Sequence, residues 1–174
     1  MSDRNKIELA NWLKSIMEET TETINGKQYL LEVGVPSDKK ERDDEGVTNA
    51  QLMFFHENGA PLRNIPKRPV LAISIDYIER MGVLNKNLGK AIDIYFKSNK
   101  IEDFEKQLNI LASKTENVAR EIIYQNQGVL APNAPSTIRK KGENYPLFDS
   151  SHLEGIHLAR SIIARIVDES GRVV

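Results

Sequence analysis

His56 and Glu57 stand side by side in the segment FFHENGAPLRNIPKRPVL, and this pair most invites interpretation as a metal or catalytic site. A zinc metalloprotease helix places two histidines four residues apart, so that both reach the metal from one face. Ala60 occupies the position of the second histidine. The pair therefore does not predict a zinc site. The remaining interpretations of the segment are a nucleic-acid arm and a structural clasp.

The other candidates for metal or catalytic chemistry also fail on spacing. His152 and His157 are five residues apart, which does not place them well on one helix face, and no third ligand is nearby. A calcium loop in the acidic stretch that ends at Glu45-Gly46 would need a glutamate where Leu52 stands. Nucleophile-elbow, P-loop and dinucleotide-binding motifs do not occur in the sequence. We therefore expect no catalytic residue, no metal and no cofactor.

Length and charge limit the class of protein. At 174 residues the chain fits one domain, expected to cover residues 1–174, with exposed loops at 36–46 and 128–147. Its 24 basic and 25 acidic residues give a net charge of −1, which excludes a global attraction to nucleic acid or to an anionic membrane. Cysteine is absent, the N-terminus lacks the pattern of a secretory signal, and no apolar run reaches the ~20 residues that span a bilayer. These features predict a soluble protein made in the cytosol.

Two short basic clusters are local exceptions to this charge balance. Their members are Arg63, Lys67 and Arg68, and Arg139, Lys140 and Lys141. Basic side chains in such clusters are able to contact phosphates. The alternative is that both clusters keep exposed, proline-containing segments soluble or pair with acidic partners. The sequence leaves the two interpretations open.

Hydrophobic periodicity and turn residues predict the elements of the first half of the chain. Apolar residues at helical spacing predict a helix over residues 3–23, and KQYLLEVGV (Lys27–Val35) has the composition of a strand. Thr48 is expected to cap a short helix that ends at Gly59, with a strand as the alternative. Three prolines between residues 60 and 70 then predict an extended arm that precedes the next helix.

Helical patterns dominate residues 70–122. One helix is expected on each side of Gly82. Asn99 with Glu102 resembles the capping box of a third helix. This third helix is the strongest signal in the chain, because its seam alternates steps of three and four residues. The seam consists of Ile101, Phe104, Leu108, Leu111, Thr115, Val118 and Ile122.

The last part of the chain reads as a long connection followed by a strand. Prolines at 132, 135 and 146 make the segment after Gly128 too punctuated for a helix. Long connections of this kind are usually functional or become ordered on assembly. The segment Leu158–Glu169 has the aliphatic density of a strand and is expected to pair with residues 28–35.

Five segments, taken in order, resemble the tail-completion (neck) proteins of long-tailed bacteriophages, which include the lambdoid tail-component and Mu-type virion morphogenesis proteins. The segments are FFHENG (Phe54–Gly59), IPKRPVL (Ile65–Leu71), LAPNAPSTIRKKG (Leu130–Gly142), PLFDSSHL (Pro146–Leu153) and ARSIIARIV (Ala159–Val167). The chain departs from the family pattern at Asn58, where an aromatic residue is usual. Ser150 and Ser151 are a second departure, because Thr-Gly is usual there.

This resemblance implies an α+β fold, with a small antiparallel sheet packed by a long helix and with extended loops. It also implies a structural virion protein, made in the cytoplasm of the host bacterium, that forms a homo-oligomeric ring, expected to be a hexamer, in the neck. The implied partners are the head-completion or connector protein and the tail terminator or tube protein, with non-specific contact to genomic DNA in the lumen. No membrane partner is expected.

The residues expected to contact partners lie in the proline-rich arm and in the long connection. They are Arg63, Ile65, Lys67, Arg68, Pro69, Asn133, Pro135, Thr137 and Arg139. The alternative for Ile65 and Pro69 is that they pack on their own domain. Two other functions stay open: a tail terminator or minor head protein, and a small metal-dependent enzyme or nuclease that uses His56, Glu57 and Asp149.

Overall fold

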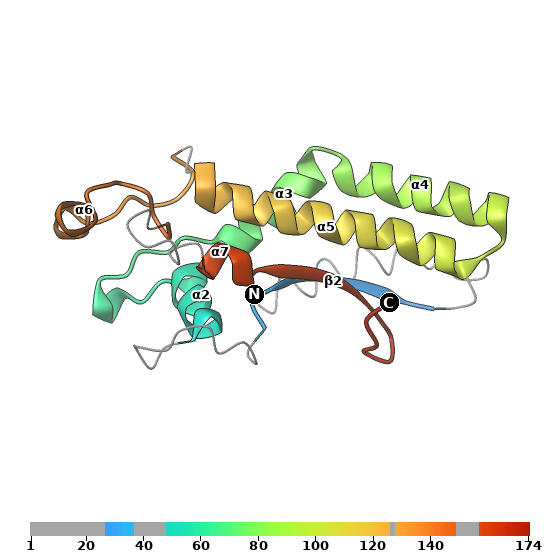
Figure 1. Ribbon diagram of the computed structural model, residues 1–174, viewed down its shortest axis with the longest axis horizontal. Helices are drawn as coiled ribbons and strands as arrows, with labels where there is room; N and C mark the ends of the chain where they lie inside the picture. The colour runs from blue at the N-terminus through green and yellow to red at the C-terminus, as the bar shows by residue number, and fades with distance from the viewer. Residues whose placement is uncertain (1–26, 37–47, 126–127, 149–156) are drawn as a thin grey trace. The chain divides into compact units, whose positions relative to one another are not determined.

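The computed structural model describes residues 27–36, 48–125, 128–148 and 157–174 (Figure 1). The helix expected over residues 3–23 and almost all of the expected loop at 36–46 lie outside these ranges. The described residues group into two compact units that alternate along the chain. Unit 1 contains residues 27–33, 75–115 and 164–174, and unit 2 contains the others.

The sheet consists of two antiparallel strands, β1 (Tyr29–Gly34) and β2 (Ile163–Asp168). Burial alternates along β1, where Tyr29, Leu31 and Val33 are buried, as the two-residue period of a strand requires. The expected pairing of the two segments is confirmed. Together with six helices in the described residues, the sheet confirms the α+β class.

Two helices, α4 (Val83–Ser98) and α5 (Ile101–Gln125), follow each other and lie side by side in Figure 1. In unit 1 the ring of Phe104 on α5 contacts both Tyr95 on α4 and Tyr29 on β1, with centroids 6.4 and 5.5 Å apart. This aromatic cluster joins the helix pair to the sheet. The expected long helix is therefore confirmed as an element that packs on the sheet.

Asn99 does not begin α5, so the expected capping box with Glu102 is wrong. Asn99 adopts a left-handed conformation with φ 53°, and its backbone N–H donates to the carbonyl oxygen of Tyr95. This is the geometry that ends a helix, because the bond satisfies one of the last carbonyl groups. Asn99 is thus the C-cap of α4, and α5 begins two residues later.

The buried line of α5 differs from the expected seam in its second half. Phe104, Leu108, Leu111 and Thr115 are buried as expected, but the line then continues through Ala119 and Ile123, and not through Val118 and Ile122. Both tracks have helical spacing, so periodicity alone does not choose between them. Thr115 lies in the apolar line because its hydroxyl donates to the carbonyl oxygen of Leu111.

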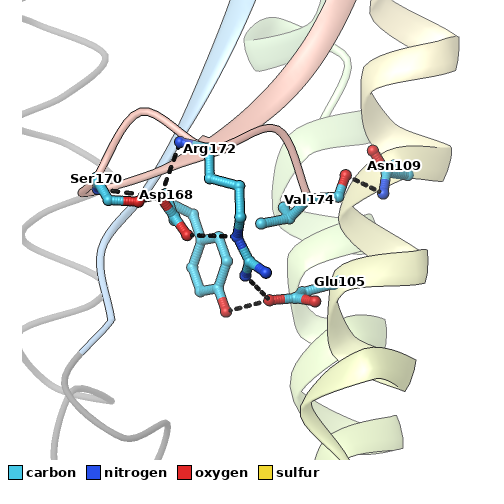
Figure 2. Close-up of polar contacts among 7 residues, drawn as sticks. Glu105, Asn109, Asp168, Ser170, Arg172 and Val174 are labelled. Carbon is cyan, nitrogen blue, oxygen red and sulfur yellow. Dashed lines mark hydrogen bonds and ion pairs between the residues drawn. The ribbon is translucent and has the colours of Figure 1, made fainter.

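The residues after β2 fold back on unit 1 through a turn organised by Asp168 (Figure 2). Its carboxylate accepts hydrogen bonds from the backbone amides of Ser170 and Arg172, both at 3.0 Å, and from the side chains of both residues. Hydrogen bonding to the Ser170 hydroxyl is the main cause that lowers the pKa of Asp168 to about 2. Asn109 on α5 donates to the carbonyl oxygen of Val174 at 2.8 Å, which ties the segment to the helix.

Unit 2 begins with α2 (Asn49–Asn58), whose expected N-terminus is confirmed. The Thr48 hydroxyl accepts from the backbone N–H of Gln51, and the Gln51 side chain accepts from the backbone N–H of Thr48, which is a capping box. Gly59 ends the helix, as expected. The helix α3 (Val70–Arg80) begins at the residue after Pro69, which confirms that no α-helix precedes it in the proline-rich arm.

The long connection is not free of helix, contrary to the expectation. Helix α6 (Pro135–Lys141) occupies it, shown in orange in Figure 1. Pro135 is compatible with a helix because it stands in the first turn, where its missing N–H is not needed, and Gly142 ends the helix in a left-handed conformation. None of the seven residues of α6 is buried.

The expected strand over Leu158–Glu169 is wrong in its first part. Residues His157–Ser161 form a short helix, α7, and only Ile163–Asp168 form the strand. The side chain of Arg120 on α5 explains the change, since it donates to the carbonyl oxygens of Ala159, Arg160 and Ile162 at 3.2, 3.4 and 2.9 Å. A positive side chain at these carbonyls stabilises the end of the helix.

Candidate partner-binding surface

The proline-rich arm contains a closed loop at residues 60–65, called the tip loop below. Ala60 and Ile65 exchange two backbone hydrogen bonds, of 2.9 and 3.1 Å, as an antiparallel bridge. Between them Pro61–Arg63 form a single 3-10 turn, η1, which Asn64 ends in a left-handed conformation. The expectation of a fully extended arm is therefore wrong at the tip, because the bridge forces the chain to reverse.

Gly59 allows the base of the tip loop to close. Its backbone has φ 76° and ψ 160°, a combination that is essentially restricted to glycine. A Cβ atom at this position would lie 3.1 Å from the backbone nitrogen of Lys67, which is tighter than nine in ten real contacts of this kind. Glycine is therefore needed here both for its conformation and for the close approach of the two arms of the loop.

Glu57 connects α2 to the beginning of α3. Its side chain is buried, and its two carboxylate oxygens accept the backbone N–H groups of Leu71 at 3.1 Å and Ala72 at 2.9 Å. These amides belong to the first turn of α3, where N–H groups have no partner within the helix and where the helix dipole favours a negative charge. Burial nevertheless raises the pKa of Glu57, and the two hydrogen bonds oppose that rise.

Arg68 connects the proline-rich arm to the long connection. The side chain is only 5% exposed, and its guanidinium donates to the carbonyl oxygens of Ala131 at 2.8 Å and Pro132 at 2.9 Å, and to Asn133 Oδ1 at 3.3 Å. Its backbone N–H donates to the carbonyl oxygen of His56 at 2.6 Å. Burial lowers the pKa of Arg68 from its usual value. The buried Arg68 thus links the proline-rich arm to the long connection and to the last turn of α2.

The half-buried side chain of His56 also contacts Arg68. Its Nδ1 atom lies 3.4 Å from Nη1 of Arg68. Burial, with a second contribution from the positive charge of Arg68, lowers the pKa of His56 to about 4. The imidazole is therefore neutral at pH 7, because protonation would place a second positive charge beside the guanidinium.

The long connection is held by a second set of contacts around Asn133. The Asn133 side chain donates to the carbonyl oxygen of Tyr145 at 3.2 Å, and its backbone N–H donates to Asn144 Oδ1 at 3.3 Å. Lys141, the last residue of α6, donates to the carbonyl oxygens of Tyr145 and Phe148. These bonds close the loop that carries α6, so that α6 projects from a fixed base.

The expected partner-contacting residues divide into three groups in the structure. Arg68 and Asn133 are buried and hold unit 2 together, whereas Ile65 and Pro69 are half-buried. The other five are exposed, and their contact with a partner stays a prediction. They are Arg63, Lys67, Pro135, Thr137 and Arg139.

Two exposed apolar residues were not expected from the sequence. Leu62 at the tip of the loop is 102% exposed, and Phe54 on α2 is 61% exposed. Arg63 lies over the ring of Phe55, with 5.6 Å between the guanidinium carbon and the ring centroid. The available signal for Leu62 was a leucine directly after a proline, in a segment without the spacing of a core-facing element.

The charge of this surface differs from that of the rest of the chain. Residues 54–70 and 129–142 contain six basic side chains and one acidic side chain, a net charge of +5. The chain as a whole has −1, so the remaining residues carry −6. The single acidic side chain is Glu57, which is buried at the start of α3. The exposed charges of these two segments are therefore all positive.

The residues of the enzymatic alternative do not meet at a described site. His56 and Glu57 are both engaged in the contacts above, and Asp149 lies outside the described residues. Within the described ranges, no group of three or more histidine, aspartate or glutamate side chains is placed to hold a metal ion. In the same ranges, no helix is long and apolar enough to cross a membrane.

Comparisons with models of protein families, with curated proteins and with solved structures found no match for this chain.

Proposed function

We propose that this chain is a structural, non-enzymatic component of the virion of a tailed bacteriophage. In this proposal it forms a ring in the neck, expected to be a hexamer, and joins the tail to the head connector. The proposal rests on the order of the five sequence segments that resemble tail-completion proteins. Three of these segments, around His56, Arg68 and Asn133, are joined by side-chain contacts of the buried Arg68 in unit 2.

The structural observation that carries the proposal is the position of the charged side chains in and next to the proline-rich arm. Glu57 and Arg68 lie inside the unit, where they bind backbone groups of α3 and of the long connection. The side chains that remain exposed on the tip loop, α2 and α6 include a leucine, a phenylalanine and several basic residues. A fixed, exposed loop loses little conformational entropy when a partner captures it, which suits an assembly protein.

The partners in this proposal are further copies of the chain, a head-completion or connector protein, and a tail terminator or tube protein. Genomic DNA passes through a neck of this kind. Exposed basic residues such as Arg139 and Lys140 on α6 would meet its phosphates without reading sequence. A role as tail terminator or minor head protein would change the partner but not the structural class, and cross-linking in assembled particles separates these roles.

Electron microscopy of particles made without this gene tests the proposal, with the gene supplied in trans as the control. We expect DNA-filled or leaking heads beside complete free tails, because the two halves of the virion would assemble but not join. Restoration of joined particles by the supplied gene would tie the defect to this chain. Normal infectious virions in the absence of the gene would contradict the proposal.

A further inference from the structure

Four exposed basic side chains of unit 2 have no acidic partner among the described residues. They are Arg63 and Lys67 in the proline-rich arm and Arg139 and Lys140 on α6. Elsewhere in the described residues, six basic side chains do form ion pairs with carboxylates, namely Arg80, Lys97, Lys106, Arg120, Arg165 and Arg172. The described surface thus leaves the positive charge of the four side chains available to an anion.

Acidic side chains are almost absent from the segments that carry these four residues. Glu57 is the only one within residues 54–70 and 129–142, and it is buried against the first turn of α3. Glu143, which directly follows Gly142, is half-buried. When Glu143 is counted, six basic and two acidic side chains still give a net charge of +4. A local excess of one sign of charge raises the concentration of oppositely charged ligands at a surface.

The buried Arg68 holds the bases of the two segments against each other. Lys67 directly precedes Arg68, whose guanidinium donates to the carbonyl oxygens of Ala131 and Pro132. Helix α6 begins at Pro135, only three residues after Pro132. In Figure 1 the tip loop and α6 both project on the left side of unit 2. Two basic clusters that are more than 70 residues apart in the sequence are therefore carried on one side of the unit.

The basic residues of the proline-rich arm are held in place before any ligand binds. The bridge between Ala60 and Ile65 closes the backbone around Arg63, and the Arg63 guanidinium carbon lies 5.6 Å from the ring centroid of Phe55. The close approach of the Lys67 backbone to Gly59 fixes the other side of the loop. Side chains on such a fixed loop lose less conformational entropy when they bind a ligand.

The composition of this surface favours nucleic acid over an acidic protein. Interfaces with DNA are much more positively charged than those between proteins, and a basic patch without exposed carboxylates is their electrostatic signature. Leu62 at the tip is also exposed, but single exposed apolar side chains are common on protein surfaces and do not by themselves indicate an apolar partner. The unpaired positive charge is the feature that needs a ligand.

We propose that Arg63, Lys67, Arg139 and Lys140 form one surface that binds the phosphate backbone of duplex DNA without reading its sequence. Two cations come from the proline-rich arm and two from α6, so the tip loop and α6 hold the same duplex. The inference deepens the proposed function and rests on it for the source of the DNA. Each phosphate contact contributes about −0.9 to the slope of log K against log salt, so four contacts predict a slope of about −3 to −4.

Fluorescence anisotropy of a short, labelled DNA duplex of mixed sequence tests this surface. The duplex is titrated with the full chain between ~50 and ~200 mM salt, and we expect a dissociation constant on the order of 10 μM at the lowest salt. The double variants Arg63→Gln with Lys67→Gln and Arg139→Gln with Lys140→Gln should each change the slope to about −2, because two contacts remain. The variant with all four substitutions should not bind.

Lys86→Gln with Lys90→Gln is the matched control. Both lysines are exposed and lie one helical turn apart on α4, so this variant loses the same charge as each double variant but outside the proposed surface. It should bind the duplex like the unmodified chain. Circular dichroism should give all variants the same helix content and melting temperature, because none of the substituted side chains is buried.

Failure of the unmodified chain to bind the duplex would overturn the surface. A control variant that binds as weakly as the other double variants would overturn it too, because binding would then follow net charge alone. Loss in only one of the two pairs would contradict a joint surface of the tip loop and α6. Binding of labelled poly-L-glutamate as tight as that of the duplex, and lost in the same variants, would assign the surface to an acidic protein instead.

The DNA surface and the proposed function fail in different ways. Binding of the duplex with the predicted pattern, but normal virions without the gene, would keep the surface and remove the neck role. A joining defect without the gene, but no binding of the duplex, would keep the neck role and remove this surface.

Discussion

The carboxylate of Glu57 accepts a 2.9 Å hydrogen bond from the backbone N–H of Ala72, across the whole proline-rich arm. The same side chain accepts the N–H of Leu71, so the last turn of α2 directly caps the first turn of α3. The tip loop lies between these two anchored points in the sequence. The position of the tip loop therefore depends on Glu57, which in the sequence is part of the possible metal motif with His56.

Replacement of Glu57 should lower stability according to the number of hydrogen bonds lost. Glu57→Ala leaves two buried amides without an acceptor and should lower the free energy of unfolding by about 1 to 3 kcal/mol. Glu57→Gln keeps one acceptor oxygen and should cost about 1 kcal/mol. Urea denaturation measures both, with Glu79→Ala as an exposed control that should change stability by less than about 0.5 kcal/mol. Equal values for Glu57→Ala and Glu79→Ala would contradict the capping role.

Arg68 should be far more sensitive to substitution than its neighbour Lys67. Arg68→Lys keeps the charge but cannot reach the oxygens of Ala131, Pro132 and Asn133 together, and it should lower the free energy of unfolding by about 2 to 4 kcal/mol. Lys67→Ala should have little effect, because Lys67 is exposed. Urea denaturation compares the two. If Lys67→Ala proved as costly as Arg68→Lys, the buried network would not be what fixes the arm.

His56 should make stability depend on pH between 4 and 6.5. The pKa of His56 is about 4 in the folded chain and ~6.5 when unfolded, so the unfolded state binds more protons in this window. The contribution of His56 is therefore complete above pH 6.5 and is lost as pH falls, by about 2 kcal/mol between pH 7.5 and pH 5.

The measurement is the free energy of unfolding of the unmodified chain and of His56→Asn at both pH values. Because asparagine does not titrate, the variant should lack this component, and the difference between the two proteins should shrink toward pH 5. A difference that is independent of pH would show that the histidine is not held neutral.

Gly59→Ala should cost more than Gly142→Ala, although both glycines have nearly the same positive φ. Gly142 is in the ordinary left-handed region with open space around it, so alanine there should cost about 1 kcal/mol. Gly59 combines a conformation restricted to glycine with a 3.1 Å approach to Lys67, so the cost should be about 2 to 3 kcal/mol. Thermal unfolding of the two variants provides the comparison. Equal costs would mean that the close approach is unimportant.

Asp168→Asn should loosen the turn after β2 without affecting α5. The amide of asparagine accepts hydrogen bonds less strongly than the carboxylate that now binds Ser170 and Arg172. Hydrogen exchange should become faster at the backbone amides of Arg172 and Val174, and Glu169→Gln is the exposed control. Since the pKa of Asp168 is lowered to about 2, its contribution is present above ~3.9 and disappears only as pH falls through about 2.

Periodicity and capping residues predicted most of the helices and both strands because those signals are local. Thr48 and Gly59 were placed correctly from their residue types as cap and stop signals, and the seam from Phe104 to Thr115 from its spacing. Helix α7 was missed because its aliphatic sequence also suits a strand, and the choice is made by Arg120, almost 40 residues away. Local pattern carries no information about such a partner.

The candidate surface was predicted only in part, for the same reason. Exposed basic residues followed from composition, but the buried position of Arg68 depends on carbonyl groups more than 60 residues later in the chain. The reversal at Ala60 and Ile65 brings Leu62 to a tip, whereas the prolines alone indicated an extended arm. The sequence therefore indicated which segment matters but not which of its side chains are free to contact a partner.

Localisation of this chain in the assembled virion tests the central claim most directly. Purified virions, isolated heads and isolated tails would be labelled with gold-conjugated antibody against the chain and imaged by electron microscopy. We predict label in a single cluster at the junction of head and tail in intact virions. Absence of the chain from purified virions, or label spread over the capsid or at the distal end of the tail, would contradict the account.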